Sequence, residues 1–320
     1  MSSVAVIGAG AWGTALAIQA ARAGNDVTLW ARDPQRAGMI AVSRENPRLP
    51  GVRLPASILV TDAAPTAVGI ALLAAPMQHI RHVLRQLPPS LAPLVVCAKG
   101  LETGTLRLPL EIIDELRPAT PAAVLTGPNF AHEIAAGLPA ASVVAGTDPA
   151  LRAEIIETLA TPAFRLYGND DPVGAQVGGA AKNVIAIAAG AVIGAGLGEN
   201  ARAALITRGL AELSRLAVAL GGRAETVSGL SGLGDLLLTC TGPSSRNYSL
   251  GLALGRGEAL ADILAARDTV TEGVATAPAL LARAAGADLP ICAAVAALVQ
   301  GRTTLREAIA VLLARPRRDE

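Results

Sequence analysis

Residues 4–13 constrain the fold of this chain more than any other stretch of its sequence. Four apolar residues lead directly into glycines at positions 8, 10 and 13, and an alanine-rich segment follows. This order predicts a strand, a tight turn and a helix. Gly8 would form the turn, Gly10 would let backbone N–H groups approach a pyrophosphate, and Gly13 would let the helix pack closely on the strand. The positive end of the helix dipole would face the ligand's negative charge. We therefore predict a dinucleotide site, the alternative being a glycine-rich turn beside an empty crevice.

The second predicted strand, residues 27–30, bears on the choice of cofactor. A site for NAD alone usually places Asp or Glu at the end of this strand, where the carboxylate holds the ribose 2′-hydroxyl. This chain has Ala31 and Arg32 there, and a guanidinium can bind a 2′-phosphate through two parallel hydrogen bonds. We therefore expect NADP(H) to be accepted, beside NAD(H) or in preference to it. Asp33 is expected to cap the helix that begins at Pro34.

The remaining pattern predicts two domains. Residues 57–168 alternate short apolar β-type runs with helical segments, and after Asp171 only helical patterns follow. Such alternation is typical of an α/β, Rossmann-type fold with a doubly wound, mostly parallel sheet covered on both faces. A chain of 320 residues is also long for one core. We expect a dinucleotide-binding domain over residues 1–175 and an all-helical substrate or catalytic domain over residues 176–320.

Composition argues against several other classes of protein. A net charge of +1, from 27 basic and 26 acidic residues, offers no surface for nucleic acid. Three scattered cysteines favour a reduced, cytoplasmic protein over a disulfide framework or a zinc site. The most apolar run, residues 184–197, has 14 residues, whereas a membrane span needs about 20, so we expect a buried helix. His79 and His82 have no carboxylate or cysteine nearby, so a solvated helix face is expected there and no metal site.

Lysine is strongly avoided in this chain. Of its 27 basic residues only Lys99 and Lys182 are lysines, so arginine serves wherever any positive charge suffices. A lysine kept against that bias suggests a site that needs a compact ammonium able to give up a proton, which arginine cannot do. The alternative is that both lysines are there by chance.

Lys99 follows one of the predicted strands of the sheet. Residues 74–76, 97–100 and 126–129 each come at the end of such a strand. Ligands of this fold bind outside the carboxyl ends of the strands. Lys99, together with Gly127 and Asn129 on the next strand end, is therefore expected to line the crevice where a nicotinamide and a substrate would meet.

Lys182 is expected at the start of the first long helix, residues 173–195, among small residues that let other backbone come close. Cations are disfavoured at that end of a helix, so function would explain Lys182 better than helix stability does. Asp235 and Thr239 are spaced four apart, which places them on one helix face. The alternative for Asp235 is that it merely caps a helix over residues 236–239.

Residues 244–247 offer hydroxyls, a guanidinium and an amide at a predicted helix start. Ser245, Arg246 and Asn247 carry these groups, which suit the binding of a phosphate monoester. The alternative is an ordinary helix capped by a serine.

Seven segments, in sequence order, carry a resemblance to a known enzyme family. They are GAGAWGTALA near the N-terminus, AKGLE around Lys99, GPNFAHEIA at 127–135, GGAAKN around Lys182, NARAALITRGLAE at 200–212, GLSGLGDLLLTC at 229–240 and SRN at 245–247. Together they resemble the bacterial NAD(P)-dependent glycerol-3-phosphate dehydrogenase family along almost the whole chain. The resemblance implies reversible reduction of dihydroxyacetone phosphate to sn-glycerol 3-phosphate with NADH or NADPH. It also implies a cytoplasmic enzyme that feeds phospholipid synthesis.

The resemblance also implies roles for single residues. Lys182 would donate or accept the proton, and Lys99 would contact the substrate and the cofactor. The other substrate contacts implied are Gly127, Asn129, Asp235 and Thr239, with Ser245, Arg246 and Asn247 on the substrate phosphate. The cofactor contacts implied, beside the glycines at positions 8, 10 and 13, are Ala11, Trp12, Arg32, Ala131, Arg246, Val270 and Glu272.

Two residues depart from the family pattern. Asn129 stands where the family usually has Ser or Thr; because an amide keeps a donor and an acceptor, a substrate contact there would be altered rather than abolished. Ala11 stands where Ser is frequent, which would leave contacts with the cofactor at that position to the backbone N–H groups.

Two other functions remain compatible with the residues. One is another two-domain dehydrogenase, of the ketopantoate or 3-hydroxy acid type, which would need a carboxylate site. The other is a redox sensor that binds NADP(H) without turnover, which would leave Lys99, Lys182 and Asp235 unexplained. The expected partner is a small triose phosphate, and a homodimer joined through the alanine-rich helices stays open.

Overall fold

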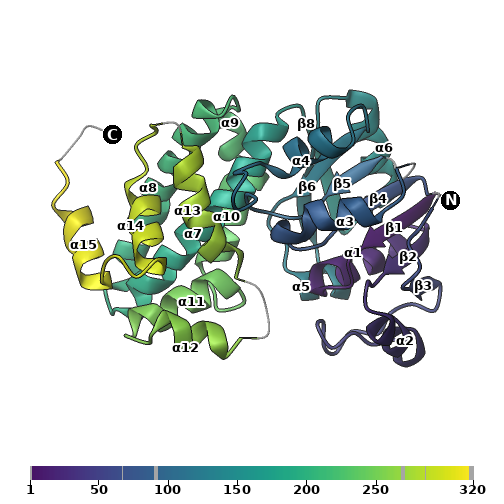
Figure 1. Cartoon of the computed structure of the whole chain (residues 1–320), viewed down its shortest axis with the longest axis horizontal. Coiled ribbons are helices and arrows are strands. Elements are labelled where there is room, and N and C mark those ends of the chain that lie inside the picture. Colours follow the sequence, from purple (N-terminus) through teal and green to yellow (C-terminus); the bar gives the residue numbers. More distant parts are fainter. Residues whose placement is uncertain (1, 67, 90–92, 268–270, 285, 317–320) are drawn as a thin grey trace. The chain divides into compact units, whose positions relative to one another are not determined.

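A computed structural model describes residues 2–66, 68–89, 93–267, 271–284 and 286–316. The chain forms two compact units. The first comprises Met1–Lys99 and Arg107–Gln176, and the second comprises Gly100–Leu106 and Val177–Glu320. The first unit contains the sheet and the second is helical, as Figure 1 shows. The α/β class with a helical C-terminal part is thus confirmed.

One eight-stranded sheet organises the first unit. Its strand order is β3-β2-β1-β4-β5-β6-β7-β8, and every neighbouring pair is parallel except β6 and β7. The prediction of a doubly wound, mostly parallel sheet is therefore confirmed. The strands are β1 (Ser3–Ile7), β2 (Asp26–Trp30), β3 (Ile58–Thr61), β4 (Ile70–Leu73), β5 (Leu94–Val96), β6 (Ala122–Thr126), β7 (Ala140–Ala145) and β8 (Phe164–Asn169).

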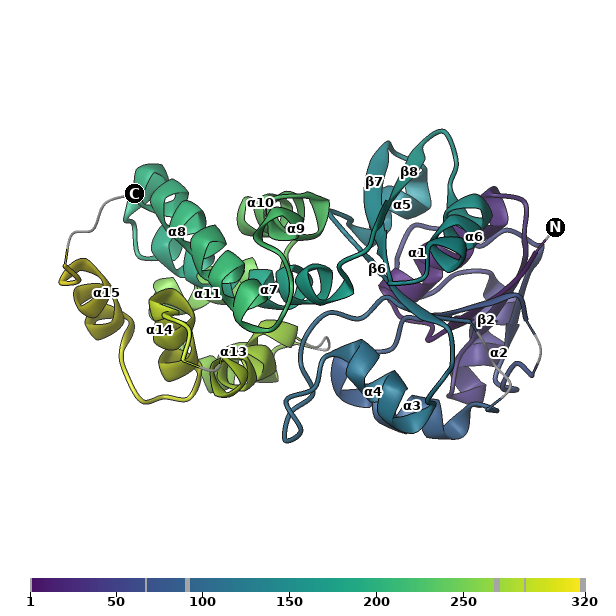
Figure 2. The same ribbon diagram turned by 90° about the horizontal axis from the view of Figure 1, so that it is seen from above.

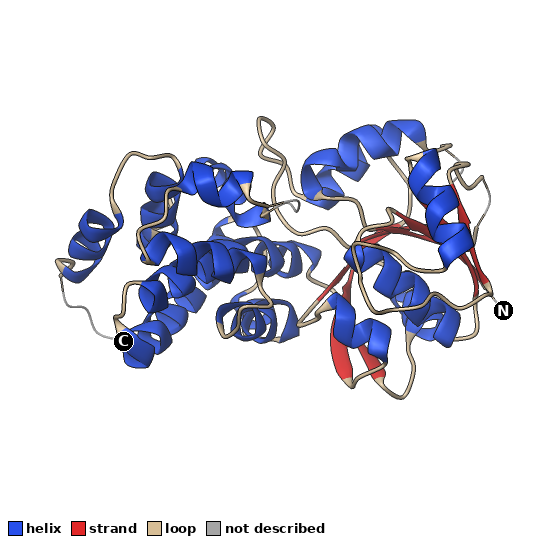
Figure 3. Ribbon diagram, turned by 90° about the horizontal axis from the view of Figure 1, so that it is seen from below, coloured by secondary structure: helices blue, strands red, loops and turns tan. Residues whose placement is uncertain are grey.

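Helices cover both faces of this sheet. Helices α1, α5 and α6 lie on one face and α3 and α4 on the other (Figures 2 and 3). Because the central strands β1, β4 and β5 are covered on both faces, they are almost wholly apolar rather than alternating. The helices are α1 (Ala11–Arg22), α2 (Pro34–Ser43), the short 3₁₀ turn η1 (Met77–His79), α3 (Ile80–Gln86), α4 (Pro109–Leu116), α5 (Ala131–Ala136) and α6 (Pro149–Leu159).

The second unit is built around α7 (Pro172–Gly194), of which the residues from Val177 onward belong to it. Two glycines let α7 and α11 cross at backbone contact. A Cβ on Gly190 would lie 2.0 Å from the Tyr248 oxygen, and a Cβ on Gly251 would lie 1.9 Å from the Ile187 oxygen. The other elements are α8 (Gly198–Ala219), α9 (Ala224–Val227), the π turn η2 (Leu230–Gly234), α10 (Asp235–Cys240), α11 (Arg246–Gly255), α12 (Leu260–Ala265), α13 (Glu272–Arg283), α14 (Pro290–Val299) and α15 (Leu305–Leu313).

The apolar run of residues 184–197 lies mostly within α7, which has 23 residues. The expectation that this segment is too short to cross a membrane was therefore wrong, because the helix that contains it begins well before the apolar run. By length and composition α7 could span a bilayer, but 83% of its most apolar window is buried inside the protein. The expectation of a buried helix is confirmed, and a core helix accounts for the same length and hydropathy.

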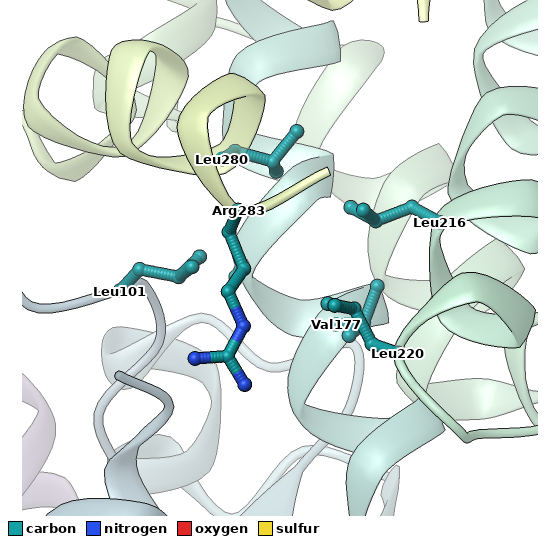
Figure 4. A pocket seen from close by; sticks show the side chains of 7 residues that line it. Leu101, Val177, Leu216, Leu220, Leu280 and Arg283 are labelled. Carbon is teal, nitrogen blue, oxygen red and sulfur yellow. The ribbon is translucent and has the colours of Figure 1, made fainter. Parts of the chain in front are cut away.

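The segment Gly100–Leu106 belongs to the helical unit, although a single boundary near residue 175 would assign it to the first. Leu101 lines a small apolar gap together with residues of α7, α8 and α13, including Leu280 (Figure 4). Arg283, at the same gap, donates from Nη1 to the Leu106 carbonyl oxygen at 3.3 Å. Apolar packing and this hydrogen bond hold the segment on the helices.

Candidate active site

The glycine turn after β1 has the geometry that its sequence predicts. Gly8 has φ +118°, a left-handed conformation that favours glycine. A Cβ on Gly13 would lie 1.9 Å from the Gly8 carbonyl oxygen. Gly8 therefore turns the chain, and Gly13 brings α1 against the turn.

Backbone strain and close packing do not explain the glycine at position 10. Its φ of −83° suits any residue, and a Cβ there would find no protein atom within 4 Å. Neither strain nor packing requires glycine, so the open space suits a ligand that approaches the backbone. Gly10 is also the N-cap of α1, with no side-chain cap and no acidic residue in the first turn. The N–H groups of this turn, which include those of Ala11 and Trp12, thus suit an anion such as a pyrophosphate.

Arg32 lies two residues after the end of β2 at Trp30 and is exposed. It lies near the glycine turn, because the Gly8 N–H donates to the Trp30 carbonyl oxygen at 3.0 Å, two residues before Arg32. Asp33 caps α2, as predicted, with Oδ1 accepting from the Gln35 N–H at 3.0 Å. Arg32 thus provides an exposed positive charge near the glycine turn.

The ends of β5 and β6 bring three predicted site residues together on the first unit. Lys99 Nζ donates to the Gly127 carbonyl oxygen at 3.1 Å. Asn129 Nδ2 donates to Ser142 Oγ at 2.5 Å. Its Oδ1 is buried and accepts no hydrogen bond from the residues that the structure describes. A buried amide oxygen without a donor is costly, so this atom suits a ligand hydroxyl or amide. Ala131 begins α5 just beyond.

Lys182 lies in the middle of α7, ten residues after the helix begins at Pro172. The expectation of a lysine at the helix start was wrong. The dipole effect fades within the first turn, so the argument built on it does not apply. Burial singles out Lys182 instead, because its side chain is 9% exposed.

Lys182 forms a buried cluster with Asp235 and Thr239 of α10. Its Nζ donates to Asp235 Oδ1 at 2.5 Å and to Thr239 Oγ1 at 2.7 Å. The Asp235 side chain is 1% exposed. The alternative that Asp235 is the N-cap of this helix was wrong, since Gly234 is the N-cap and Asp235 is the first residue of α10. The structure therefore holds an ammonium in place with one carboxylate and one hydroxyl.

Glycines and a π turn place α10 at this distance from α7. A Cβ on Gly178 would lie 2.8 Å from the Ser231 carbonyl oxygen, so η2 touches the α7 backbone. Within η2 the Gly234 N–H donates to the Gly229 oxygen at 3.1 Å. Such π turns are frequent at functional sites. The Thr239 hydroxyl donates to the Asp235 carbonyl oxygen at 2.6 Å, which leaves its lone pairs to accept from the ammonium.

The start of α11 holds the three residues proposed for a phosphate. Ser245 caps the helix, with Oγ accepting from the Tyr248 N–H at 3.2 Å, so the predicted helix start is present. Arg246 is exposed. Asn247 is buried and donates to Asn183 Oδ1 at 2.9 Å. Its own Oδ1 accepts from the Gly273 N–H, also at 2.9 Å.

This Asn247 network reaches α13, whose first residue is Glu272, another predicted cofactor contact. Val270, predicted for the same role, lies outside the described residues. Asn183, the neighbour of Lys182, was not predicted as a site residue, although the segment that carries the resemblance contains it. His79 and His82 are both exposed, as expected of a solvated helix face.

Burial disfavours the ionised form of both thiols near these clusters. Burial raises the pKa of Cys240, next to Thr239, to about 12. Burial also raises the pKa of the Cys97 thiol, two residues before Lys99, well above its usual range. Thiols act as nucleophiles only when ionised. Burial therefore disfavours covalent attack by these two cysteines.

A glycine turn open to an anion and a buried ammonium held by a carboxylate define a dinucleotide-dependent dehydrogenase. The sequence family described as NAD-dependent glycerol-3-phosphate dehydrogenase N-terminus matches residues 3–152, and the one described as its C-terminus matches residues 171–310. The chain belongs to the NAD-dependent glycerol-3-phosphate dehydrogenase family. It is an oxidoreductase, and its cofactor is NAD or NADP.

Relatives and solved structures agree with this family. The chain is 59% identical to glycerol-3-phosphate dehydrogenase [NAD(P)+] of Acidiphilium cryptum, over 99% of this chain and 98% of the relative. It is 53% identical to the enzyme of that name from Caulobacter vibrioides, with coverage of 99% and 98%. The structure of glycerol-3-phosphate dehydrogenase from Coxiella burnetii is 36% identical, with a TM-score of 0.93 and coverage of 98% and 99%. D-mandelate dehydrogenase shares the fold alone, with 14% identity, a TM-score of 0.62 and coverage of 94% and 97%.

Proposed function

We propose that this chain reduces dihydroxyacetone phosphate to sn-glycerol 3-phosphate with NADPH or NADH, and catalyses the reverse reaction. The relatives named glycerol-3-phosphate dehydrogenase [NAD(P)+], at 50–59% identity along the chain, support this substrate. We assign cofactor binding to residues 1–175 and substrate binding to residues 176–320. The observation that carries the proposal is the buried ammonium of Lys182 between Asp235 and Thr239.

Lys182 is proposed as the proton donor in ketone reduction. When bound, the dihydronicotinamide supplies a hydride to the ketone carbon, and negative charge then develops on the ketone oxygen. An ammonium already fixed beside that oxygen stabilises the charge and delivers the proton. In the reverse direction the neutral amine accepts the hydroxyl proton. Arginine could not replace it, because a guanidinium keeps its proton.

Asp235 and Thr239 are proposed to orient Lys182. Asp235 Oδ1 and Thr239 Oγ1 each accept a hydrogen bond from Lys182 Nζ, which has three N–H donors. One donor must turn to the ketone oxygen when the substrate arrives. The Asp235 carboxylate lies 2.5 Å from the ammonium, which is the form of the lysine needed for reduction.

The substrate phosphate is assigned to the start of α11. Arg246 provides an exposed guanidinium there, and Ser245 and Asn247 flank it. A guanidinium and a helix N-terminus both favour a dianion. Lys99, Gly127 and Asn129 are assigned to the triose end of the substrate, with Lys99 also contacting the cofactor.

The cofactor is assigned mainly to the glycine turn and Arg32. The N–H groups of the turn would hold the pyrophosphate, and Arg32 the 2′-phosphate of NADP(H). Gly8, Gly10, Ala11, Trp12 and Gly13 make up this turn. Ala131, Arg246, Val270 and Glu272 complete the assignment.

We also propose that the enzyme works in the cytoplasm, where its product enters glycerophospholipid synthesis, and that it forms a homodimer. The three cysteines are free and buried, which supports a reducing compartment. Light scattering on the purified protein tests the dimer, and cell fractionation tests the compartment.

A spectrophotometric assay tests the reaction. Oxidation of NADPH and of NADH is followed with dihydroxyacetone phosphate, with unphosphorylated dihydroxyacetone and with ketopantoate. Turnover should require the phosphorylated ketone. Faster turnover of ketopantoate would support the other dehydrogenase type instead, and cofactor binding without turnover of any triose phosphate would support the sensor.

A further inference from the structure

Asn46 is a buried polar residue that lies far from the glycine turn in sequence but bonds to it in space. It is 1% exposed, in the loop that follows α2. Its Nδ2 donates to the Ala9 carbonyl oxygen at 3.1 Å and to Thr14 Oγ1 at 2.6 Å. Its Oδ1 accepts from the Arg48 N–H at 3.0 Å. The Ala9 oxygen can only accept and the Arg48 N–H can only donate, so these partners fix the orientation of the amide.

These bonds act on the peptide between Ala9 and Gly10. In a trans peptide the C=O and N–H bonds point in opposite directions. Because Asn46 holds the Ala9 oxygen on the protein side, the Gly10 N–H is directed away from Asn46. Gly10 also borders the open space in which a Cβ would meet no atom within 4 Å.

The second hydrogen bond ties the same turn to α1. Thr14 is fully buried, and its N–H donates to the Gly10 carbonyl oxygen at 2.9 Å. Asn46 therefore bridges both ends of the segment between Ala9 and the first turn of α1. A turn fixed before a ligand arrives loses less conformational entropy on binding.

The loop that carries Asn46 is itself held firmly. Leu49 and Leu54 are 4% and 2% exposed, so the loop is anchored in the core. The Leu54 N–H donates to the Arg44 oxygen at 2.8 Å, and Arg44 Nη2 donates to the Ile58 oxygen at 3.0 Å. The loop that carries the Asn46 amide is thus held in place by buried leucines and hydrogen bonds.

We propose that Asn46 is a positioning residue for the cofactor, which orients the Gly10 N–H toward the pyrophosphate and fixes the glycine turn before binding. The inference rests on the proposed cofactor role of that turn. Because Asn46 is 1% exposed and bonds to the turn, it would act on the cofactor through the turn, so its loss should weaken cofactor binding while leaving the substrate KM at saturating cofactor nearly unchanged.

The variant Asn46→Asp tests this with little change in shape, because a carboxylate cannot donate to the Ala9 oxygen. Asn25→Asp is a matched control at the other end of α1, where Asn25 Nδ2 donates to the Ala20 oxygen at 2.9 Å and the Thr158 oxygen at 2.7 Å. For each variant we would measure the cofactor Kd by fluorescence titration, the Tm without cofactor, and the amide exchange of residues 8–14. Thr14→Val is a second variant that removes only one bond, in case Asn46→Asp does not fold.

We expect the Kd of Asn46→Asp for NADPH to rise by about tenfold or more, from loss of a buried hydrogen bond. Amide exchange of residues 8–14 should also become faster. Asn25→Asp should lower Tm with its Kd within about twofold of wild type. A Kd of Asn46→Asp and Thr14→Val within twofold of wild type, with only Tm lowered, would overturn the inference. Gly10→Ala tests the cofactor role of the glycine turn separately from the positioning role of Asn46. Normal cofactor binding by that variant would overturn the proposed cofactor site itself.

Discussion

Replacing Lys182 with methionine removes one charge of a buried pair and leaves the other. The Asp235 side chain is 1% exposed, so water cannot solvate its carboxylate once the ammonium, 2.5 Å away, is gone. Breaking such a pair costs about 3–5 kcal/mol, a large part of a typical unfolding free energy of about 5–15 kcal/mol. At roughly 2–4 °C per kcal/mol, Tm should fall by about 6–20 °C.

The double variant Lys182→Met/Asp235→Asn separates stability from chemistry. Removing both charges abolishes the uncompensated carboxylate, so most of the lost stability should return. In both variants turnover should be about 10²–10⁴-fold below that of wild type, because no proton donor lies beside the substrate oxygen. Thermal melts, urea titrations and single-turnover kinetics at saturating cofactor measure these effects.

Lys99→Met is the matched control for stability. It removes an ammonium that is half-buried and donates to the Gly127 carbonyl oxygen. The loss in the free energy of unfolding should therefore be smaller than for Lys182→Met. Near-normal turnover in the double variant would refute the role of Lys182. A Lys182→Met protein as stable as wild type would refute the burial argument.

Three further changes are predicted. Arg32→Ala should raise the KM for NADPH about tenfold and barely change that for NADH, and equal rises would contradict the 2′-phosphate role. Burial raises the pKa of Glu212, which accepts from the Ile291 N–H. The folded state therefore binds this proton more tightly, so stability should fall as pH rises from the ordinary carboxyl value through the raised pKa. Urea titrations of wild type and Glu212→Gln across this range should show the slope only in wild type. Gly251→Ala should destabilise by more than about 3 kcal/mol, since its Cβ would lie 1.9 Å from the Ile187 oxygen, and an unchanged Tm would contradict this.

The features that the sequence predicts well are those set by local chemistry. A glycine turn between an apolar run and a helix, and an Asp before Pro34 that caps a helix, depend on a few adjacent residues. The parallel sheet followed from the alternation of strands and helices, and the structure confirms it. Asp235 and Thr239 were also predicted correctly to share one helix face, because their spacing equals about one turn.

Contacts between distant segments could not be predicted in the same way. Nothing in the loop around Asn46 indicates that its amide reaches the glycine turn, since that contact depends on how the loop folds over the sheet. The position of Lys182 in the helix was predicted wrongly because a long alanine-rich helix has few capping or helix-breaking residues to mark where it begins. Only the distance from Pro172 shows that Lys182 lies in the middle of α7. Helix α4 begins at Pro109, because Pro suits the first helical position and Leu106, three residues earlier, has a φ of +60°.

The most direct measurement of the central claim is a crystal structure of the enzyme with dihydroxyacetone phosphate and oxidised cofactor. We predict that Lys182 Nζ lies about 2.6–3.2 Å from the ketone oxygen while it keeps its contact with Asp235, and that the substrate phosphate lies on Arg246. A ketone oxygen bound by another donor, with Lys182 Nζ contacting only Asp235 and Thr239, would contradict the account.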